Sequence, residues 1–512
     1  MAFVISAQPP ESDLSGPRSD QLLRITDWAL RGLLLYSALM VWVGVCMLVV
    51  RMLAPERDAL GWAVGALMAA MASAGVWHLR EPVADRVRQV ARAAAVIDER
   101  RWLITCLALG LLLRVICSIM VRTGPVSDGG TYLQLAHGLL DTGSYAIGGS
   151  RAYWPPGYPM FLLPWLSAFG NDRAAIVASN FFLYFVGFFG VRALAQRLGG
   201  PVVLRLALAL YCVWPNLVLL VPMPEKEQVL LAVLPWVLVL WSDAIKPARS
   251  PLSALLAGVL LGGSMLVQPA LQVLFPVLVL MGLLESRRPR RLLLCTCLAL
   301  VGVAVIVGPW TWRNYQVFDR WVLVSTNGGP GLFGANNPKA TGGYLPLDQW
   351  PADLRAMSEL ESDREGKRRA LEWIAANPVR VAQLAIEKNA RFMGDDAVGA
   401  YQGLNRGPGA PGGWVYALVK ALSNAFWLGY WSLAMSALFV IHRERGRLCA
   451  SQLLPVAVFL HSFALHSLAE SAGKYHVLWT AVLCVMLPIL LRVDAAGDLS
   501  RPARPFAAGA LK

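Results

Sequence analysis

The stretch RVICSIMVRTGPVSDGGTYLQLAHGLLDTGSYAIGGSRAYWPPGYPMFLLPWL, residues 114–166, decides how the rest of the chain is interpreted. An apolar segment at 102–121 ends beside Arg122, and Asp128 and Tyr132 follow within a few residues. A Gly-rich connection then leads to Tyr-Trp-Pro-Pro-Gly-Tyr-Pro at 153–159, where prolines stiffen the backbone. A carboxylate just beyond the end of a membrane helix, under an aromatic and proline-rich turn, predicts chemistry at a membrane surface.

The composition is that of a membrane protein. Of 512 residues, 56% are hydrophobic and 15% are charged, whereas soluble proteins carry roughly 25% charged residues. Apolar segments of about 20 residues, the length that crosses a bilayer as a helix, recur from Trp28 to Val493. The formal net charge of +14 comes from arginines beside the ends of these segments, as the positive-inside rule expects. It therefore does not indicate a nucleic-acid partner.

The apolar segments predict an all-α polytopic protein with about twelve membrane spans and both termini in the cytoplasm. The inner side is marked by the arginines of 80–101 and of 286–291. The run 158–169 is too short to cross, and we interpret it as a half-membrane or interfacial helix. The spans lie at about 28–54, 58–79, 102–121, 173–196, 201–221, 228–246, 252–284 as two short helices divided at Gln268-Pro269, 292–312, 414–441, 450–467 and 476–493.

These segments divide the chain into six parts. A cytoplasmic tail at 1–27 precedes an N-terminal extension of two helices and a basic cytoplasmic link at 28–101. The transmembrane core at 102–312 contains the first periplasmic loop, 122–157. A polar stretch at 313–413 is long enough to form a periplasmic module, with helices predicted at about 353–376 and 378–393. The C-terminal transmembrane helices at 414–493 lead to a basic tail at 494–512.

Several chemistries are not indicated by the sequence. All eight cysteines lie in apolar segments or at their edges, so we expect neither disulfides nor a thiolate metal site. His137, His461 and His466 have no partners at zinc-site spacing. No Walker loop, dinucleotide fingerprint or serine nucleophile elbow occurs.

On this topology, four clusters gather on the outer side of the membrane. They are Asp128, the turn at 154–159, Glu225-Lys226-Glu227, and Lys474-Tyr475-His476; the polar stretch adds Arg313, Asn314, Asn336 and Asn337. Charged groups at membrane depth are costly and therefore suggest function.

Each cluster also has a structural interpretation. Asp128 precedes a helix and could be its N-cap, with about even odds when it is considered alone. Tyr153 and Trp154 fit an interfacial aromatic belt. The acidic residues of 225–227 could stabilise the start of the next helix, and Lys474 near Glu470 could be a surface ion pair of little energetic weight.

Three stretches resemble the GT-C membrane glycosyltransferases of bacterial family 39. These enzymes are related to dolichyl-phosphate-mannose-protein mannosyltransferases and to the aminoarabinose and galacturonic acid transferases of lipopolysaccharide. The first stretch is 127–143 with 155–159, the second is 308–315 with 325–329 and 334–344, and the third is 472–476. The resemblance covers about 102–493. The chain departs from the family pattern at Gln268 and Lys474, where arginine is common, and in having a lone Asp128 instead of an acidic pair.

The resemblance implies a GT-C fold with about twelve transmembrane helices and a periplasmic helical module, in the bacterial inner membrane with the active site facing the periplasm. It implies an inverting transfer of a sugar from a polyprenyl-phosphate carrier to a glycan, lipid or protein acceptor. No cofactor is certain, and a divalent metal is left open.

Residue roles follow from the chemistry of such a transfer. An acceptor hydroxyl needs a base, for which Asp128 is the candidate. A departing phosphate needs cations, and the candidate donor-binding residues are Lys226, Arg313, Lys474 and Tyr475. The candidate sugar- or acceptor-binding residues are Tyr132, Trp154, Tyr158, Glu227, Asn314, Asn336 and Asn337. The alternatives are a polysaccharide ligase or polymerase, and a transporter or flippase for lipid-linked sugars, because broken helices are also typical of transporters.

Overall fold

The computed structural model describes residues 17–54, 57–286, 288–444 and 446–491. Within these ranges the chain forms helices joined by turns and contains no β-strand. The all-α, polytopic architecture predicted from the sequence is therefore confirmed. The predicted tails fall outside the described residues at 1–16 and 494–512, as does the predicted break at Pro55.

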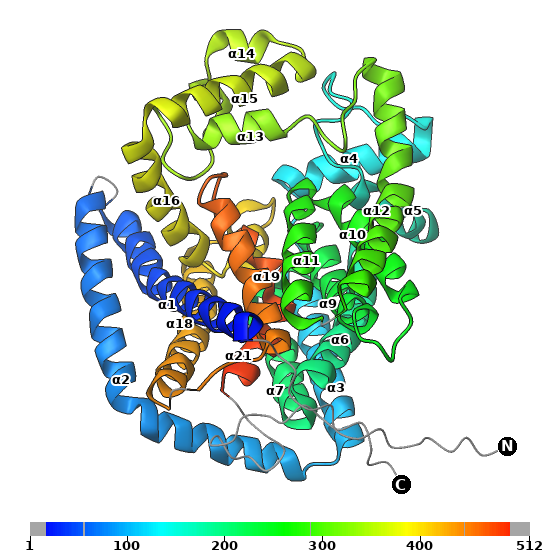
Figure 1. Cartoon of the computed structure of the whole chain (residues 1–512). Helices are drawn as coiled ribbons and strands as arrows, with labels where there is room; N and C mark the ends of the chain where they lie inside the picture. The colour runs from blue at the N-terminus through cyan, green and yellow to red at the C-terminus, as the bar shows by residue number, and fades with distance from the viewer. Residues whose placement is uncertain (1–16, 55–56, 287, 445, 492–512) are drawn as a thin grey trace, which may run out of the picture.

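The helices follow one another closely along the chain (Figure 1). Up to residue 285 they are α1 (Pro17–Leu53), α2 (Asp58–Val96), α3 (Glu99–Met120), α4 (Ser127–Thr142), α5 (Gly157–Phe169), α6 (Asp172–Leu198), α7 (Gly200–Val213), α8 (Pro215–Leu219), α9 (Glu227–Ala244), α10 (Leu252–Val267), η1 (Pro269–Val273) and α11 (Leu274–Glu285). After it they are α12 (Pro289–Phe318), α13 (Gly328–Ala335), η2 (Leu347–Gln349), α14 (Ala352–Ala356), α15 (Glu359–Ala376), α16 (Pro378–Met393), α17 (Val398–Tyr401), η3 (Gln402–Arg406), α18 (Gly413–Arg443), α19 (Ala450–His466), α20 (Lys474–Val477) and α21 (Thr480–Leu490).

Among the described residues, seven helices are long and apolar enough to cross a membrane, so this is a multi-pass membrane protein. They are α1, α2, α3, α6, α9, α12 and α18. Shorter apolar helices, α7, α10, η1 with α11, α19 and α21, lie among them. The predicted total of about twelve spans requires each shorter helix to cross as well, and that count stays a prediction.

The two N-terminal helices are longer than predicted. α1 begins at Pro17 rather than near residue 28, and α2 continues through the Arg-rich segment as far as Val96. Arginine is a good helix former, so a basic stretch can mark the inner side of a membrane without ending a helix. α2 contains Pro82, and it bends so that its second part crosses one end of the bundle toward α3 (Figure 1).

Three other boundaries bear on the candidate site. α12 continues to Phe318, so Arg313 and Asn314 lie on its last turns and not in the loop where they were predicted. The helix predicted at 201–221 is two helices, because Trp214 leaves the helical conformation ahead of Pro215. The short helix α5 and the division of the 252–284 run at Gln268 confirm two predicted interruptions.

The segment 313–413 is divided between two locations. α13, α14 and α15 lie together at one end of the bundle, near α4 (Figure 1), and α15 begins with a capping box formed by Ser358 and Glu361. α16 packs instead on α1, where Gly44 has no room for a side chain beside Ala390 and Gly394. The second half of this polar segment is therefore part of the helical bundle.

Candidate active site

An ion pair joins two segments that are far apart in the sequence. Lys474 Nζ donates to Asp128 Oδ2 at 3.0 Å, and each side chain is 30% exposed. Asp128 lies in the first turn of α4 and Lys474 begins α20. The N-cap of α4 is Val126, and no side chain caps this helix. The carboxylate of Asp128 thus faces Lys474 and does not serve as the N-cap.

A close contact between backbones brings a second lysine to this pair. Gly129 lies so near Pro224 that a Cβ at Gly129 would be 2.8 Å from Pro224 Cγ and 2.9 Å from Pro224 O. The residues that follow Pro224 are Glu225, Lys226 and Glu227, at the start of α9. Lys226 Nζ lies 5.8 Å from the centroid of the Tyr132 ring, one turn after Asp128.

The electrostatics differ among the charged groups. Burial alone would raise the pKa of Asp128, but the charges of Lys474 and Lys226 outweigh burial and hold that pKa below its usual range. Burial opposes the charge of Lys474, yet Tyr475, Asp128 and the two glutamates raise its pKa well above the usual range. Burial lowers the pKa of Lys226 and raises that of Glu225 well above its usual range. The site therefore holds an ionised Asp128 beside a Glu225 that retains its proton toward neutral pH.

Aromatic rings and two unpaired polar atoms lie beside the charged groups. Tyr132 packs edge-to-face against Trp154 at 5.7 Å and against Tyr158 at 5.5 Å between centroids. Tyr158 is 0% exposed, so its ring lies inside the protein rather than on a surface where a ligand could stack. Among the described residues, neither the buried Tyr158 hydroxyl nor the buried Glu227 Oε2 has a hydrogen-bond partner. Groups of this kind are costly unless a ligand or water satisfies them.

Tyr475 is held by two neighbours. Its hydroxyl donates to Glu470 Oε1 at 3.1 Å, and its ring stacks on that of His466 with centroids 4.4 Å apart. Burial raises the pKa of Glu470. The third predicted cluster, at 474–476, thus joins Asp128 through Lys474, while Tyr475 supports the wall beside it.

Arg313 and Asn314 act elsewhere. Arg313 donates to Arg151 O at 2.8 Å and Tyr145 O at 3.2 Å, so it clamps the first loop to α12. Asn314 is buried and donates to the carbonyls of Val322 and Val324. The structure does not bring these two predicted residues into contact with the Asp128–Lys474 pair.

Asn336 and Asn337 are also buried, and their amides are used within the protein. Asn336 donates to Leu332 O and Leu468 O and accepts from Lys388 Nζ at 3.0 Å. Asn337 donates to Phe333 O and Gly334 O. These amides hold the end of α13 and connect it to Leu468 and Lys388, so a role in binding a sugar or acceptor stays a prediction.

Glu225 belongs to the predicted 225–227 cluster but was given no role of its own, and Glu470 was named only as an ion-pair partner of Lys474. A third charged residue near Asp128, Arg406, was not singled out from the sequence. Arg406 ends the short π-helix η3, is exposed, and lies close enough to Asp128 to lower its pKa. Nothing in the sequence near Arg406 indicates this proximity, because η3 reaches the site through tertiary contacts such as the packing of Gly403 on Val121.

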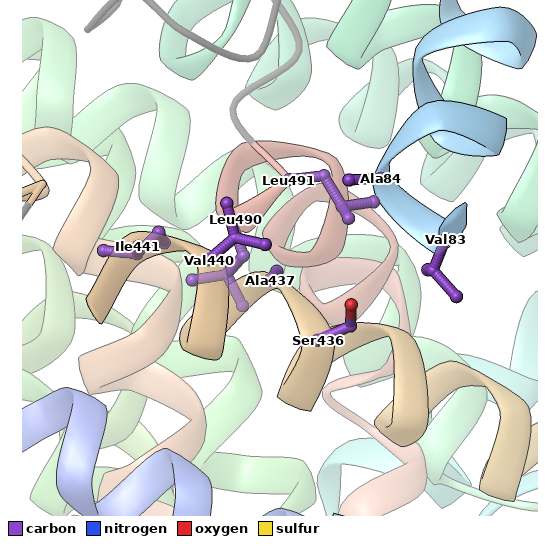
Figure 2. Close-up of a pocket in the computed structure, with 8 residues that line it drawn as sticks. All are labelled: Val83, Ala84, Ser436, Ala437, Val440, Ile441, Leu490 and Leu491. Atoms are coloured by element: carbon purple, nitrogen blue, oxygen red, sulfur yellow. The ribbon is translucent and has the colours of Figure 1, made fainter. Parts of the chain in front are cut away.

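The described residues contain no group of three or more His, Cys, Asp or Glu side chains that could hold a metal ion. A separate recess between α2, α18 and α21 is lined by apolar residues apart from Ser436 (Figure 2). It includes none of the charged residues around Asp128. Its lining supplies no groups for acid–base chemistry.

Solved structures that are similar to this chain include two of the same protein. One is ArnT from Cupriavidus metallidurans bound to undecaprenyl phosphate, with a TM-score of 0.38, and the other is ArnT from the same organism in the apo state, with a TM-score of 0.39. Each has 16% sequence identity and covers 77% of this chain and 77% of the solved chain. No protein-family model and no curated protein matches the sequence. At this level of similarity, no residue role is transferred from ArnT.

Proposed function

We propose that this protein is an inverting, GT-C-type glycosyltransferase. It would move a sugar from a polyprenyl-phosphate carrier to an envelope acceptor on the periplasmic face of the bacterial inner membrane. The observation that carries the proposal is the convergence of Asp128, Lys226 and Lys474 from three separate connections between membrane helices. These are the carboxylate and cations that such a transfer needs.

The proposed step balances as a single displacement. The acceptor hydroxyl oxygen attacks the anomeric carbon, and the bond between that carbon and the carrier phosphate oxygen breaks. The hydroxyl proton passes to the Asp128 carboxylate, which is ionised because Lys474 and Lys226 hold its pKa down. The electron pair leaves with the phosphate, whose negative charge Lys226 and Lys474 stabilise.

One buried atom without a partner among the described residues suits the sugar. Glu227 Oε2 can accept a hydrogen bond from a sugar hydroxyl. Glu227 is 5% exposed, so a sugar hydroxyl that reaches it would make its hydrogen bond away from bulk water. Lys226, between Glu225 and Glu227, places a positive charge next to that position.

The test is transfer by purified protein in nanodiscs, with a panel of polyprenyl-phosphate sugars as donors and extracted envelope lipids, glycans and proteins as acceptors. We expect Asp128→Asn to lower the rate by about 100-fold or more, the lower range for loss of a general base. The matched control is Asp141→Asn, the same change on an exposed residue of the same helix, which should transfer normally. Normal transfer by Asp128→Asn would refute the assigned base.

The same assay separates the other functions. Addition of one sugar supports a transferase, whereas addition of a long chain indicates a ligase or polymerase. In sealed proteoliposomes, movement of a labelled carrier across the bilayer without any product indicates transport. Chelation of divalent ions before the assay decides whether a metal is needed.

A further inference from the structure

We propose that Asp396 and His476 are positioning residues that hold Lys474 against Asp128, and that helix α1 supports them from the other side. This inference rests on the proposed function, because it takes the Asp128–Lys474 pair as the centre of the site. It assigns roles to a buried polar network and to the N-terminal extension, neither of which the proposed reaction uses directly.

His476 lies two residues after Lys474 and is fixed on several sides. It is 0% exposed, and its Nδ1 donates to Phe392 O at 2.5 Å, because a carbonyl can only accept. Its Nε2 lies 3.2 Å from Asp396 Oδ1. Its ring lies flat on that of Trp427, with centroids 4.3 Å apart and an interplanar angle of 9°. The ring therefore has one orientation, and that orientation fixes the short helix α20.

Asp396 joins three parts of the bundle at the same point. It is 0% exposed, and its carboxylate accepts from Trp214 Nε1 at 2.6 Å and from Asn216 Nδ2 at 2.5 Å. Both donors flank the break between α7 and α8. The backbone N–H of Asp396 donates to Asn424 Oδ1 of α18 at 2.9 Å. Because these hydrogen bonds fix the Asp396 carboxylate, it also fixes the orientation of the His476 imidazole that it contacts.

A second contact holds the other side of Lys474. Gly473 lies directly against Asp395 O, and a Cβ at Gly473 would overlap that oxygen. Asp395 is held by Lys420 Nζ at 2.9 Å and by Asn424 Nδ2 at 2.9 Å. The residues before and after Lys474 are thus both fixed by the 395–396 turn, so the position of this turn sets the position of the lysine.

α1 supports the helix that leads into this turn. A Cβ at Gly44 would overlap Ala390 O and Gly394 Cα, so α1 and the end of α16 are in backbone contact. About two turns of α1 earlier, Asn389 Nδ2 donates to the Tyr36 hydroxyl at 3.4 Å. A shift of α1 would therefore move the end of α16 and the 395–396 turn with it.

A mutant cycle tests whether the network acts through Lys474. Asp396→Asn, His476→Phe and His476→Gln are made with and without Lys474→Ala in the full chain. His476→Phe keeps an aromatic ring on Trp427, and His476→Gln keeps a side-chain donor. Each protein is measured for kcat and KM of transfer, for affinity toward a polyprenyl phosphate in nanodiscs, and for melting temperature.

We expect Asp396→Asn and His476→Phe to lower kcat/KM by about 10-fold to 100-fold, which is the effect of a displacement of about 1 Å at an active site. Both variants should also bind polyprenyl phosphate more weakly. His476→Gln should restore part of the activity and of the affinity. In the Lys474→Ala background, the same changes should alter affinity by no more than about twofold, because residues that act as a unit are not additive. Effects that multiply in both backgrounds overturn the positioning role. If Asp396→Asn does not fold, His476→Gln carries the same cycle.

A pair of glycines on α1 tests the support from this helix. Gly44→Ala places a methyl group in the contact with α16, whereas Gly32→Ala places one where no atom lies within 4 Å. Gly44→Ala should weaken polyprenyl-phosphate binding and lower kcat/KM, and Gly32→Ala should leave both unchanged. Equal behaviour of the two variants overturns the role of α1. Transfer that survives both Asp128→Asn and Lys474→Ala instead overturns the choice of this pair as the centre of the site, whereas the absence of transfer by the wild type with every donor overturns the proposed function.

Discussion

Glu225 and Lys226 are adjacent in the chain, and burial moves their pKa values in opposite directions. The pKa of Lys226 is lowered and that of Glu225 is raised. As the pH rises through these shifted pKa values, Glu225 loses its proton and becomes negative, and Lys226 loses its proton and becomes neutral. Lys226 loses its charge at a lower pH than an ordinary lysine would. We therefore expect transfer to decline on the alkaline side earlier than an unperturbed lysine would dictate. On the acid side, Asp128 keeps its charge until the pH falls through its lowered pKa.

The check is the pH profile of kcat/KM for the wild type and for Lys226→Arg. Arginine remains charged throughout the range, so the alkaline limb should move to higher pH. Glu225→Gln serves as the comparison, because glutamine cannot titrate. A limb that stays in place in Lys226→Arg but disappears in Glu225→Gln would assign the alkaline group to Glu225 instead.

Residue types alone did not distinguish the charged residues that gather around Asp128 from the asparagines that stabilise the surrounding structure. Asp128, Lys226 and Lys474 could be predicted because charged groups beside membrane helices are costly. Asn314, Asn336 and Asn337 come from an equally specific motif, yet each is buried and donates to backbone carbonyls. An asparagine that ends a helix and one that contacts a sugar look alike in a sequence. Only the partner of the amide group, which is a tertiary feature, distinguishes them.

At the scale of elements, the break between α7 and α8 concentrates buried charge. Arg114, in the span α3, is 2% exposed and donates to Gly110 O at 3.0 Å and to Cys212 O at 3.1 Å, at the end of α7. Its guanidinium lies 3.9 Å from the centroid of the Tyr184 ring. Carbonyls at a helix end have no partner within the helix. Arg114 donates to the carbonyl of Cys212 before the break, and Asp396 accepts from Trp214 and Asn216 at and after it.

Arg114→Met should therefore destabilise the protein. The free carbonyl of Cys212 would cost on the order of 1–3 kcal/mol, and the contact with Tyr184 would be lost as well. Thermal unfolding in detergent measures the change, with Arg100→Met as the control, because Arg100 is exposed on the same helix. Equal unfolding temperatures for both variants would show that Arg114 does not stabilise the break.

The elements themselves were predictable to different degrees. The division at Gln268-Pro269 and the short helix at 158–169 were predicted and are present in the structure, whereas the break ahead of Pro215 was missed because 201–221 was predicted as one helix. Helices α1, α2 and α12 were predicted too short, because each continues as helix beyond its apolar part. Hydropathy locates the portion of a helix that suits lipid, and it carries no information on how far the helix extends outside.

At the scale of the whole molecule, periplasmic transfer requires that the charged residues around Asp128 lie on the periplasmic side of the membrane. Asp128, on α4, and Lys474, on α20, follow membrane helices that are far apart in the chain and form an ion pair. α4 lies at the end of the bundle near α13–α15 (Figure 1). The arginine-rich segments predict that this end faces the periplasm. The loop between α18 and α19, with the exposed Cys449, should then face the cytoplasm.

Cysteine labelling in spheroplasts tests this orientation. In a Cys297→Ala background, which removes the other exposed thiol, native Cys449 should react with a membrane-impermeant maleimide only after permeabilisation. Asp141→Cys, combined with Cys449→Ala, should react in intact spheroplasts, because Asp141 is exposed on the helix that carries Asp128. The reverse pattern would place the charged cluster in the cytoplasm. A carrier presented at the periplasmic face could not reach a cluster on that side, so the reverse pattern would contradict the proposed periplasmic transfer even if the protein bound polyprenyl phosphate.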